Sequence, residues 1–223
     1  MKLLALDGNS LTYRAFFALP TDMATASGQV TNAVYGFTSM LTTLMKDQRP
    51  DGVVVVFDRK ELTFRHEAAP EYKAQREKQP DSLYSQLDTV KELLAAAGVT
   101  TLECAGFEGD DIIATIAAGI GDNELLIVTG DRDSYQLVKD PLVRVLYNKR
   151  GVSDYALYDE SGIKERTGVT PSQYADYAAL RGDPSDNLEG VPGVGEKTAA
   201  KLITQYETLV DRKSTRLNSS HVA

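Results

Sequence analysis

The 223-residue chain is 42% hydrophobic, has a formal net charge of −8, and contains no apolar run near the about 20 residues that span a membrane. These values predict one large globular domain, or one domain and part of a second, in a cytoplasmic protein that does not bind membranes. A single Cys104 and two histidines, His66 and His221, exclude an internal disulfide and a cysteine-rich metal centre and argue against a Ser-His-Asp hydrolase, so any metal here would be a hard cation on oxygen ligands.

Short apolar runs alternate with helical periodicity along the first 150 residues. Residues 2–6, 53–57 and 124–128 are typical of buried strands, and 99–104 and 143–147 could extend the sheet. Apolar residues near 3.6 spacing predict helices over 30–46, 82–97, 110–118 and, later, 171–181. The alternation predicts an α/β fold with a mainly parallel central sheet flanked by helices.

Each of the three main predicted strands ends in aspartate. Asp7 follows the first, Asp58 the second, and Asp131 with Asp133 the third. Carboxyl ends of strands form the ligand crevice of open α/β sheets, so these side chains should converge. The motif FEGDD and the loop GDPSD complete a set of nine candidates: Asp7, Asp58, Glu108, Asp110, Asp111, Asp131, Asp133, Asp183 and Asp186.

These carboxylates permit two interpretations. A single Asp after a strand, or at the start of the helix at Asp110 and Asp111, is ordinary turn or capping chemistry. Two unit charges about 4 Å apart repel by about 4 kcal/mol at an effective dielectric of 20, so a crowded set needs cations. Shared carboxylates around two divalent ions are typical of phosphodiester hydrolysis, and the bound ions would offset the acidic net charge. We therefore expect a metal site, with Asp110 or Asp111 also capping the helix.

A basic insertion follows Asp58. It carries Arg59, Lys60, Arg65, Lys73, Arg76 and Lys78, with Phe64 and Tyr72 between them. Cations for phosphates and aromatics for bases suit a single-strand path. A solvated helical surface is the alternative, because glutamates nearly balance the basic residues. The position directly after a metal-site candidate favours substrate handling.

The segment LEGVPGVGEKTAAK resembles a P-loop but has Glu196 where the lysine of that motif is required. A helix–hairpin–helix fits better, with Gly190, Gly193 and Gly195 in the hairpin and a helix beginning near Glu196. Its backbone N–H groups, with Lys197, Thr198 and Lys201, could hold a DNA phosphate without reading bases. A tight turn between packed helices is the alternative.

Taken together, these motifs strongly resemble the 5′-nuclease domain of bacterial DNA polymerase I, in the flap endonuclease superfamily. The matching pieces are LDGNSLTYRAFFA, VVFDRKELTFRHE, PEYKAQR, FEGDDIIAT, VTGDRDSYQLV and LRGDPSDNLEGVPGVGEKTA, in the order of the family. The resemblance implies a PIN-like nuclease core over residues 1–180 with a helical arch at about 59–85, and the start of a helix–hairpin–helix DNA-binding region at 181–209.

Carried over by motif, Asp7, Asp58, Glu108, Asp110 and Asp111 would serve one metal ion. Asp131, Asp133, Asp183 and Asp186 would serve the second or orient its waters. Arg14, Arg65, Lys73 and Arg76 match positions that contact the scissile phosphate or gate the 5′ strand, and Tyr72 lies in the same arch.

The activity implied is hydrolysis of DNA at a 5′ flap, nick or 5′ end by a two-metal-ion mechanism, including RNA primers in a hybrid. Mg²⁺ is the implied cofactor, with Mn²⁺ as a substitute and K⁺ at the hairpin. The resemblance further implies a monomer with a polymerase domain in the same chain of the native gene. Two other classes stay open: a DNA-binding fragment that does not cut, and another metal-dependent phosphotransferase, which would need neither hairpin nor basic insertion.

The end of the sequence departs from the family. Residues 211–223, DRKSTRLNSSHVA, replace the further helices expected there. Residues 211–221 are one possible translation of a common sequencing-adapter sequence. We expect a non-native tail on a truncated domain, and exclude it from the fold.

Overall fold

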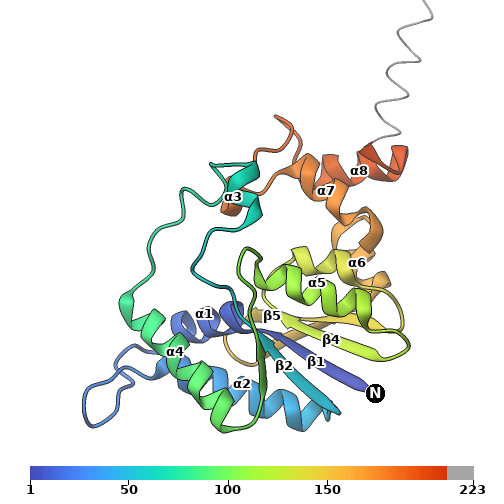
Figure 1. Ribbon diagram of the computed structural model, residues 1–223. Helices are drawn as coiled ribbons and strands as arrows, with labels where there is room; N and C mark the ends of the chain where they lie inside the picture. Colours follow the sequence, from blue (N-terminus) through green and yellow to red (C-terminus); the bar gives the residue numbers. More distant parts are fainter. Residues whose placement is uncertain (210–223) are drawn as a thin grey trace, which may run out of the picture.

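The computed structural model describes residues 1–209, which fold around one six-stranded sheet with the strand order β3-β2-β1-β4-β5-β6 (Figure 1). Neighbouring strands are parallel except for the last pair, β5 and β6, which is antiparallel. The strands are β1 (Lys2–Asp7), β2 (Gly52–Val56), β3 (Thr100–Leu102), β4 (Glu124–Thr129), β5 (Val143–Arg150) and β6 (Asp154–Tyr158). The predicted α/β class is confirmed.

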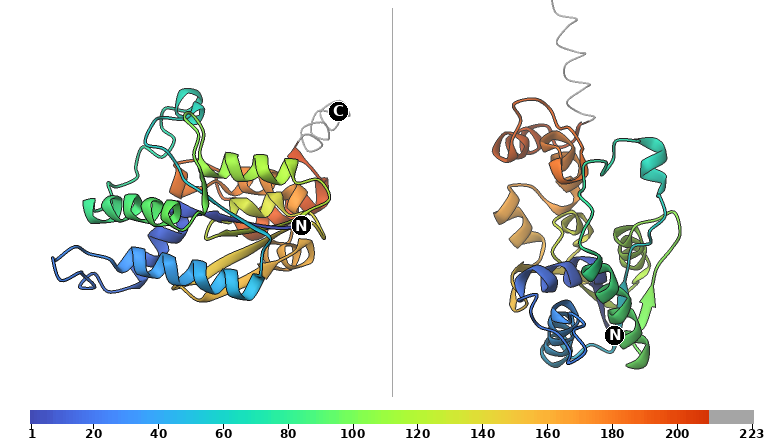
Figure 2. Two further views of the ribbon diagram at one scale, coloured as in Figure 1. Left: turned by 60° about the horizontal axis from the view of Figure 1, so that its bottom comes forward. Right: turned by 90° about the vertical axis from the view of Figure 1, so that its left-hand side faces the viewer.

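Helices cover both faces of this sheet. One face carries α1 (Gly8–Ala18), α2 (Asn32–Gln48) and α4 (Asp81–Ala96), and the other carries α5 (Gly109–Gly119) and α6 (Glu160–Thr167), as Figures 1 and 2 show. The short α3 (Phe64–Ala68), α7 (Tyr174–Arg181) and α8 (Glu196–Tyr206) lie above the sheet in the view of Figure 1. Single 3-10 turns complete the set: η1 (Asp133–Leu137), η2 (Pro171–Gln173) and η3 (Pro184–Asp186).

Alternation within the strands builds a core on each face. Leu4 and Leu6 pack towards α1, α2 and α4, whereas Ala5 between them packs towards α5. Successive side chains of a strand point to opposite faces, so strands covered on both sides are apolar throughout. This explains why the three main strands were visible in the sequence as continuous apolar runs.

The structure departs from the predicted elements in several places, and the helices α1 and α6 have no predicted counterpart. The antiparallel edge strand β6 was not predicted, because its sequence DYALY is short and only partly buried at the edge of the sheet. The helix expected over 171–181 is the turn η2 followed by α7. The predicted arch at about 59–85 is helical only at α3 and, from Asp81, at the start of α4. Between them run turns and extended chain, bounded by Pro70 and Pro80, which disfavour a continuous helix.

Strand β1 marks the point where the chain changes direction across the sheet. The chain moves from β1 to β2 and β3 on one side, and then returns to β4 on the other side. Such a switch point leaves a crevice at the carboxyl ends of the two diverging strands. Asp7 ends β1 and Asp131 follows β4, so both aspartates lie at this crevice.

Among residues 1–209, no helix combines the length and the apolar character that crossing a membrane requires. The predicted non-native tail, 211–223, lies outside the described residues.

Gly8 joins β1 to α1 under the ring of Phe57. A Cβ atom at Gly8 would lie 2.4 Å from Phe57 Cε1, whereas a Cβ atom at Gly119, the last residue of α5, would meet nothing within 4 Å. We predict that Gly8→Ala lowers the free energy of unfolding by about 1–3 kcal/mol through overpacking. Gly119→Ala should be neutral or stabilise by up to about 1 kcal/mol. Urea unfolding midpoints test this pair, and equal midpoints for the two variants would contradict it.

Candidate active site

Asp7 is held in place by hydrogen bonds from the start of α1 and from the end of β4. It caps α1 by accepting a hydrogen bond from the Ser10 amide at 2.9 Å, and its second oxygen accepts from the Thr129 hydroxyl at 2.7 Å. Thr129 Oγ1 in turn accepts from the Asp131 amide at 3.0 Å. The carboxyl ends of β1 and β4 are therefore joined by one hydrogen-bond chain that orients two of the predicted aspartates.

Asp58 follows β2 and faces the start of α5. Its Oδ1 accepts from the Gly109 amide at 2.6 Å, and its own amide donates to Asn9 Oδ1 at 3.0 Å. A Cβ atom at Gly109 would lie only 3.2 Å from Asp58 Oδ1, so glycine allows the helix to approach this closely. The approach brings Asp110, the next residue, to the crevice.

Burial and mutual repulsion both act on the carboxylates of the crevice. Burial, followed by repulsion from Asp7, Asp131 and Asp58, raises the pKa of Asp110 to about 8. Burial also raises the pKa of Asp7 to about 6, against hydrogen bonds from Ser10 and Thr129 that lower it. Asp7, Asp58, Asp110 and Asp131 thus line one cleft.

A second group adjoins the first through Asp131. Burial, with repulsion from Asp131, Asp183 and Asp186, raises the pKa of Asp133 to about 6. Asp183 is oriented by the Ser185 amide at 2.8 Å and the Ser185 hydroxyl at 2.7 Å. We call the combined set the acidic rim: Asp7, Asp58, Asp110, Asp131, Asp133, Asp183 and Asp186.

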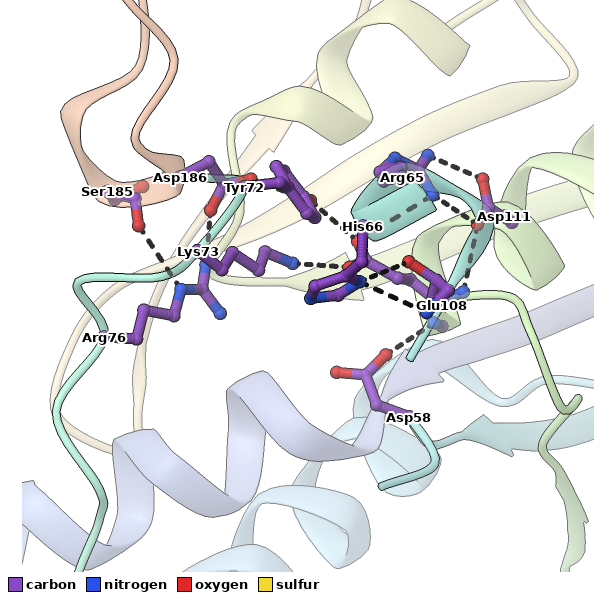
Figure 3. Close-up of polar contacts among 12 residues, drawn as sticks. Asp58, Arg65, His66, Tyr72, Lys73, Arg76, Glu108, Asp111, Ser185 and Asp186 are labelled. Carbon is purple, nitrogen blue, oxygen red and sulfur yellow. Dashed lines mark hydrogen bonds and ion pairs between the residues drawn. The ribbon is translucent and has the colours of Figure 1, made fainter. Parts of the chain in front are cut away.

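Glu108 and Asp111, also predicted as metal ligands, form ion pairs with basic side chains of the segment between β2 and α4 (Figure 3). Arg65 donates two parallel hydrogen bonds of 2.7 Å to Asp111, and this contact lowers the pKa of Asp111. Lys73 Nζ donates to Glu108 at 2.8 Å. Both carboxylates therefore already have positively charged partners within the chain.

The same segment reaches across to the loop at Asp186. The Tyr72 hydroxyl lies 3.0 Å from oxygens of both Glu108 and Asp186, and Arg76 forms an ion pair with Asp186 (Figure 3). Tyr72 is only 6% exposed, so its ring offers no open face to a base, whereas Phe64 is 47% exposed. In this arrangement Tyr72 tethers the segment to the site, and Phe64 supplies the accessible aromatic surface.

The acidic rim has the donors that a hard divalent cation prefers. Carboxylate oxygens are typical Mg²⁺ ligands, and the raised pKa of Asp110 reflects a need for positive charge that a cation would meet. Within residues 1–209, no three Asp, Glu, His or Cys side chains already converge in a geometry that would hold a metal ion. The residues fit such an ion by the chemistry of their oxygen atoms and by their shared cleft.

Arg14 lies on α1 beside this rim. Its Nη2 donates to the carbonyl oxygen of Asn148 at 3.1 Å, and its Nη1 to that of Lys149 at 3.4 Å. Together with Lys73 and Arg76, it lines a cleft of about 800 Å³ that also contains Asp7, Asp58, Asp110 and Asp131. The three basic residues share one cleft with the aspartates, whereas Arg65 forms its ion pair with Asp111.

The hairpin glycines differ in their surroundings. A Cβ atom at Gly190 would lie 2.4 Å from the Arg181 carbonyl and the Gly182 amide, so Gly190 serves close backbone packing. Gly193 has a φ of +77°, and a Cβ atom at Gly193 or Gly195 would meet nothing within 4 Å. Lys197, Thr198 and Lys201 are exposed on α8, on the face away from the buried Ala199 and Ile203.

Sequence reasoning missed the polar residues that orient the acidic rim. Thr129 precedes the motif GDRDS and bridges Asp7 and Asp131, and Ser10 accepts from the Gly130 amide at 2.9 Å. The available signal for Thr129 was its position as a polar residue at the end of an otherwise apolar strand. The loop pairing of Ser10 with Gly130 had no local signal, because the two residues are far apart in the chain.

The comparisons with known proteins agree with this geometry. Residues 2–168 match the family model of the 5′-3′ exonuclease N-terminal resolvase-like domain, and residues 169–216 match the 5′-3′ exonuclease C-terminal SAM fold. The chain is 53% identical over 211 residues to DNA polymerase I of Mycobacterium bovis, and 44% identical over 210 residues to that of Bacillus caldotenax. Each match covers 93% of this chain but only 23% and 24% of the relative.

Solved structures share the fold. T5 D15 protein co-crystallised with metal ions superposes with a TM-score of 0.76 at 24% identity, covering 95% of this chain and 77% of that one. The catalytic core of Rad2 in complex with DNA substrate superposes with a TM-score of 0.62 at 21% identity, covering 98% and 66%. With the family models spanning nearly all the described residues, the chain belongs to the 5′-3′ exonuclease family.

Proposed function

We propose that this chain is a structure-specific 5′ nuclease that hydrolyses DNA phosphodiesters with two divalent cations on the acidic rim. The observation that carries the proposal is the gathering of Asp7, Asp58, Asp110 and Asp131 in one cleft, where bound cations would offset both their burial and their mutual repulsion. Mg²⁺ is the proposed resident ion, with Mn²⁺ as a substitute. Two such ions, when bound, activate the attacking water and stabilise the leaving oxygen.

Residues of the chain itself would orient the substrate. Asp7 and Asp58 are fixed by backbone amides, so a phosphate near them meets a preorganised site. The Arg14 guanidinium, anchored on two carbonyl oxygens, is positioned to bind a non-bridging phosphate oxygen in the same cleft. Metal-ligand roles for Asp131, Asp133, Asp183 and Asp186 around a second ion belong to the same proposal.

The segment between β2 and α4 would exchange its partners when DNA enters. Lys73 and Arg76 now pair with Glu108 and Asp186, and each could release its carboxylate to a cation while turning to the phosphate backbone. Arg65 on Asp111 and Tyr72 between Glu108 and Asp186 would hold the segment in place meanwhile. Glu108 and Asp111 would then act through water.

The hairpin would contact the duplex beyond the cut. Gly193 and Gly195 leave open space for a phosphate or for K⁺ on the backbone, and Lys197, Thr198 and Lys201 lie exposed on the following helix. We extend the proposal to a 5′ flap, nick or 5′ end as substrate, including an RNA primer in a hybrid, and to action as a cytoplasmic monomer in replication and repair. The polymerase domain of the longer relatives is proposed to follow in the native gene.

Cleavage of a duplex with a labelled 5′ flap tests the proposed function. We expect cutting near the flap junction with Mg²⁺ and none with EDTA. Asp58→Asn should reduce the rate by at least about 100-fold while leaving DNA binding in place, because it removes one charge from the rim without changing its shape. Asp47→Asn, an exposed position of α2, is the matched control and should cut normally.

Two results would contradict this expectation. If Asp58→Asn cut DNA as fast as wild type, the acidic rim would have no role in the hydrolysis. DNA binding without Mg²⁺-dependent cutting by a folded wild-type chain would favour a DNA-binding module instead.

Stability in EDTA should fall as the pH rises. Asp110 keeps its proton in the folded state up to about pH 8, whereas an ordinary Asp loses it near 3.8, so the folded state binds more protons between these values. Asp7 and Asp133 add to the slope up to about pH 6. We expect Asp110→Asn to flatten the decline, and Mg²⁺ to stabilise wild type more at pH 8 than at pH 6. Thermal melts across this range provide the measurement, and a stability that rises from pH 5 to 8 in EDTA would contradict it.

A further inference from the structure

A small cavity lined by three arginines lies between α7, the start of α8 and the turn at η1. Its volume is about 230 Å³, and its lining consists of Arg132, Arg166, Thr167, Tyr174, Tyr177, Arg181 and Glu196. We call it the arginine pocket. None of the three arginines was among the residues assigned to the acidic rim or to the segment between β2 and α4.

Positive charge exceeds negative charge in the arginine pocket. Glu196 Oε1 is shared between Arg132 Nη1 at 3.3 Å and Arg181 Nη1 at 3.6 Å, both longer than the about 2.8 Å of a good charge-assisted hydrogen bond. Asp133 also interacts electrostatically with Arg181. Within residues 1–209 Arg166 makes no ion pair; it donates to the Tyr158 hydroxyl at 3.1 Å. A chain with a net charge of −8 thus concentrates guanidinium groups around a loosely bound carboxylate.

Tyr174 supplies an independent sign of a missing ligand. Its side chain is 1% exposed and lines the pocket, and its hydroxyl is buried without a hydrogen-bond partner in the described part of the chain. Buried hydroxyl groups in folded proteins nearly always have a partner. Arg132 and Arg181 both act electrostatically on this hydroxyl, so an anion held by them would also meet a donor.

The volume of the arginine pocket and its position beside the acidic rim indicate what kind of ligand it binds. Pockets for drug-sized molecules begin at about 300 Å³, so this one suits a single phosphate-sized group better than a nucleotide. An adjoining cleft of about 700 Å³ shares Arg132, Arg181 and Glu196 with it and extends to Asp131, Asp133 and Asp183. A polyanion placed at the acidic rim would therefore have a continuous route to the arginines.

We propose that the arginine pocket binds one backbone phosphate of the DNA substrate away from the bond that is cut, and that Glu196 is the internal counterion which this phosphate displaces. The proposal rests on the proposed nuclease function and adds a positioning contact to it. Arg132, Arg166 and Arg181 bind the phosphate, and the Tyr174 hydroxyl donates to one of its oxygens. Glu196 shields the guanidinium groups until DNA arrives.

Equilibrium binding of a fluorescent 5′-flap duplex in EDTA tests this proposal across salt concentrations. Arg166→Gln and Arg132→Gln should each weaken binding about 5- to 10-fold and reduce the slope of log K against log salt by at most about 0.9, the value for the one phosphate that the pocket binds. Arg166→Lys should keep most of the slope, since it keeps the charge. Glu196→Gln should tighten binding about 3-fold, an opposite change that a misfolded variant would not give.

The matched control is Arg144→Gln. Arg144 is a half-exposed arginine at the start of β5 whose partner is Glu124 at 3.7 Å, and the substitution should leave both affinity and slope unchanged. Urea midpoints should stay near wild type for every variant used.

The outcomes distinguish a failure of this proposal from a failure of the proposed nuclease function. If wild type binds and cuts DNA while Arg132→Gln and Arg166→Gln match the Arg144→Gln control, the phosphate contact is wrong and the nuclease stands. If wild type binds no DNA, both are wrong. A third outcome is that millimolar inorganic phosphate stabilises wild type but not Arg166→Gln, while the substitution leaves DNA affinity unchanged. The pocket then binds free phosphate, and its assignment to DNA is overturned.

Discussion

Repulsion among carboxylates at the switch point between β1 and β4 is the constraint on which this structure depends. Asp7, Asp58 and Asp131 come from the ends of three adjacent strands, and α5 adds Asp110 to the same crevice. A fold selected for stability alone would not gather them, because burial already penalises each charge and every neighbour adds to the penalty. The hydrogen-bond chain through Thr129 and the close approach of Gly109 to Asp58 hold the aspartates together against this repulsion.

The segment between β2 and α4 and the arginine pocket can be understood as two responses to the same excess of charge. On one side of the rim, Arg65, Lys73 and Arg76 pair with Asp111, Glu108 and Asp186 (Figure 3). On the other side, Arg132 and Arg181 share Glu196. In both places basic groups that suit a phosphate are paired with carboxylates of the chain. Binding of a polyanion together with divalent cations would exchange these pairs, so substrate and metal would each favour the binding of the other.

The acidic residues at the strand ends could be predicted from the sequence, whereas the contacts between residues far apart in the chain could not. Residues such as Asp7 and Asp58 follow continuous apolar strands, and the rule that carboxyl ends meet at one edge was enough to gather them. The pairing of Asp111 with Arg65 and of Glu108 with Lys73 was not predictable, because the partners are 46 and 35 residues apart in the chain. The burial of Tyr72 and the pairing of Arg181 with Glu196 likewise depend on tertiary contacts that have no periodic or motif signature.

Anomalous diffraction from crystals soaked in Mn²⁺ would locate the ions independently of catalysis. We expect one ion among Asp7, Asp58, Asp110 and Asp131, and a second bounded by Asp131, Asp133, Asp183 and Asp186, with Glu108 and Asp111 reaching the ions through water at most. Manganese peaks elsewhere, with the acidic rim free of metal at saturating Mn²⁺, would contradict it.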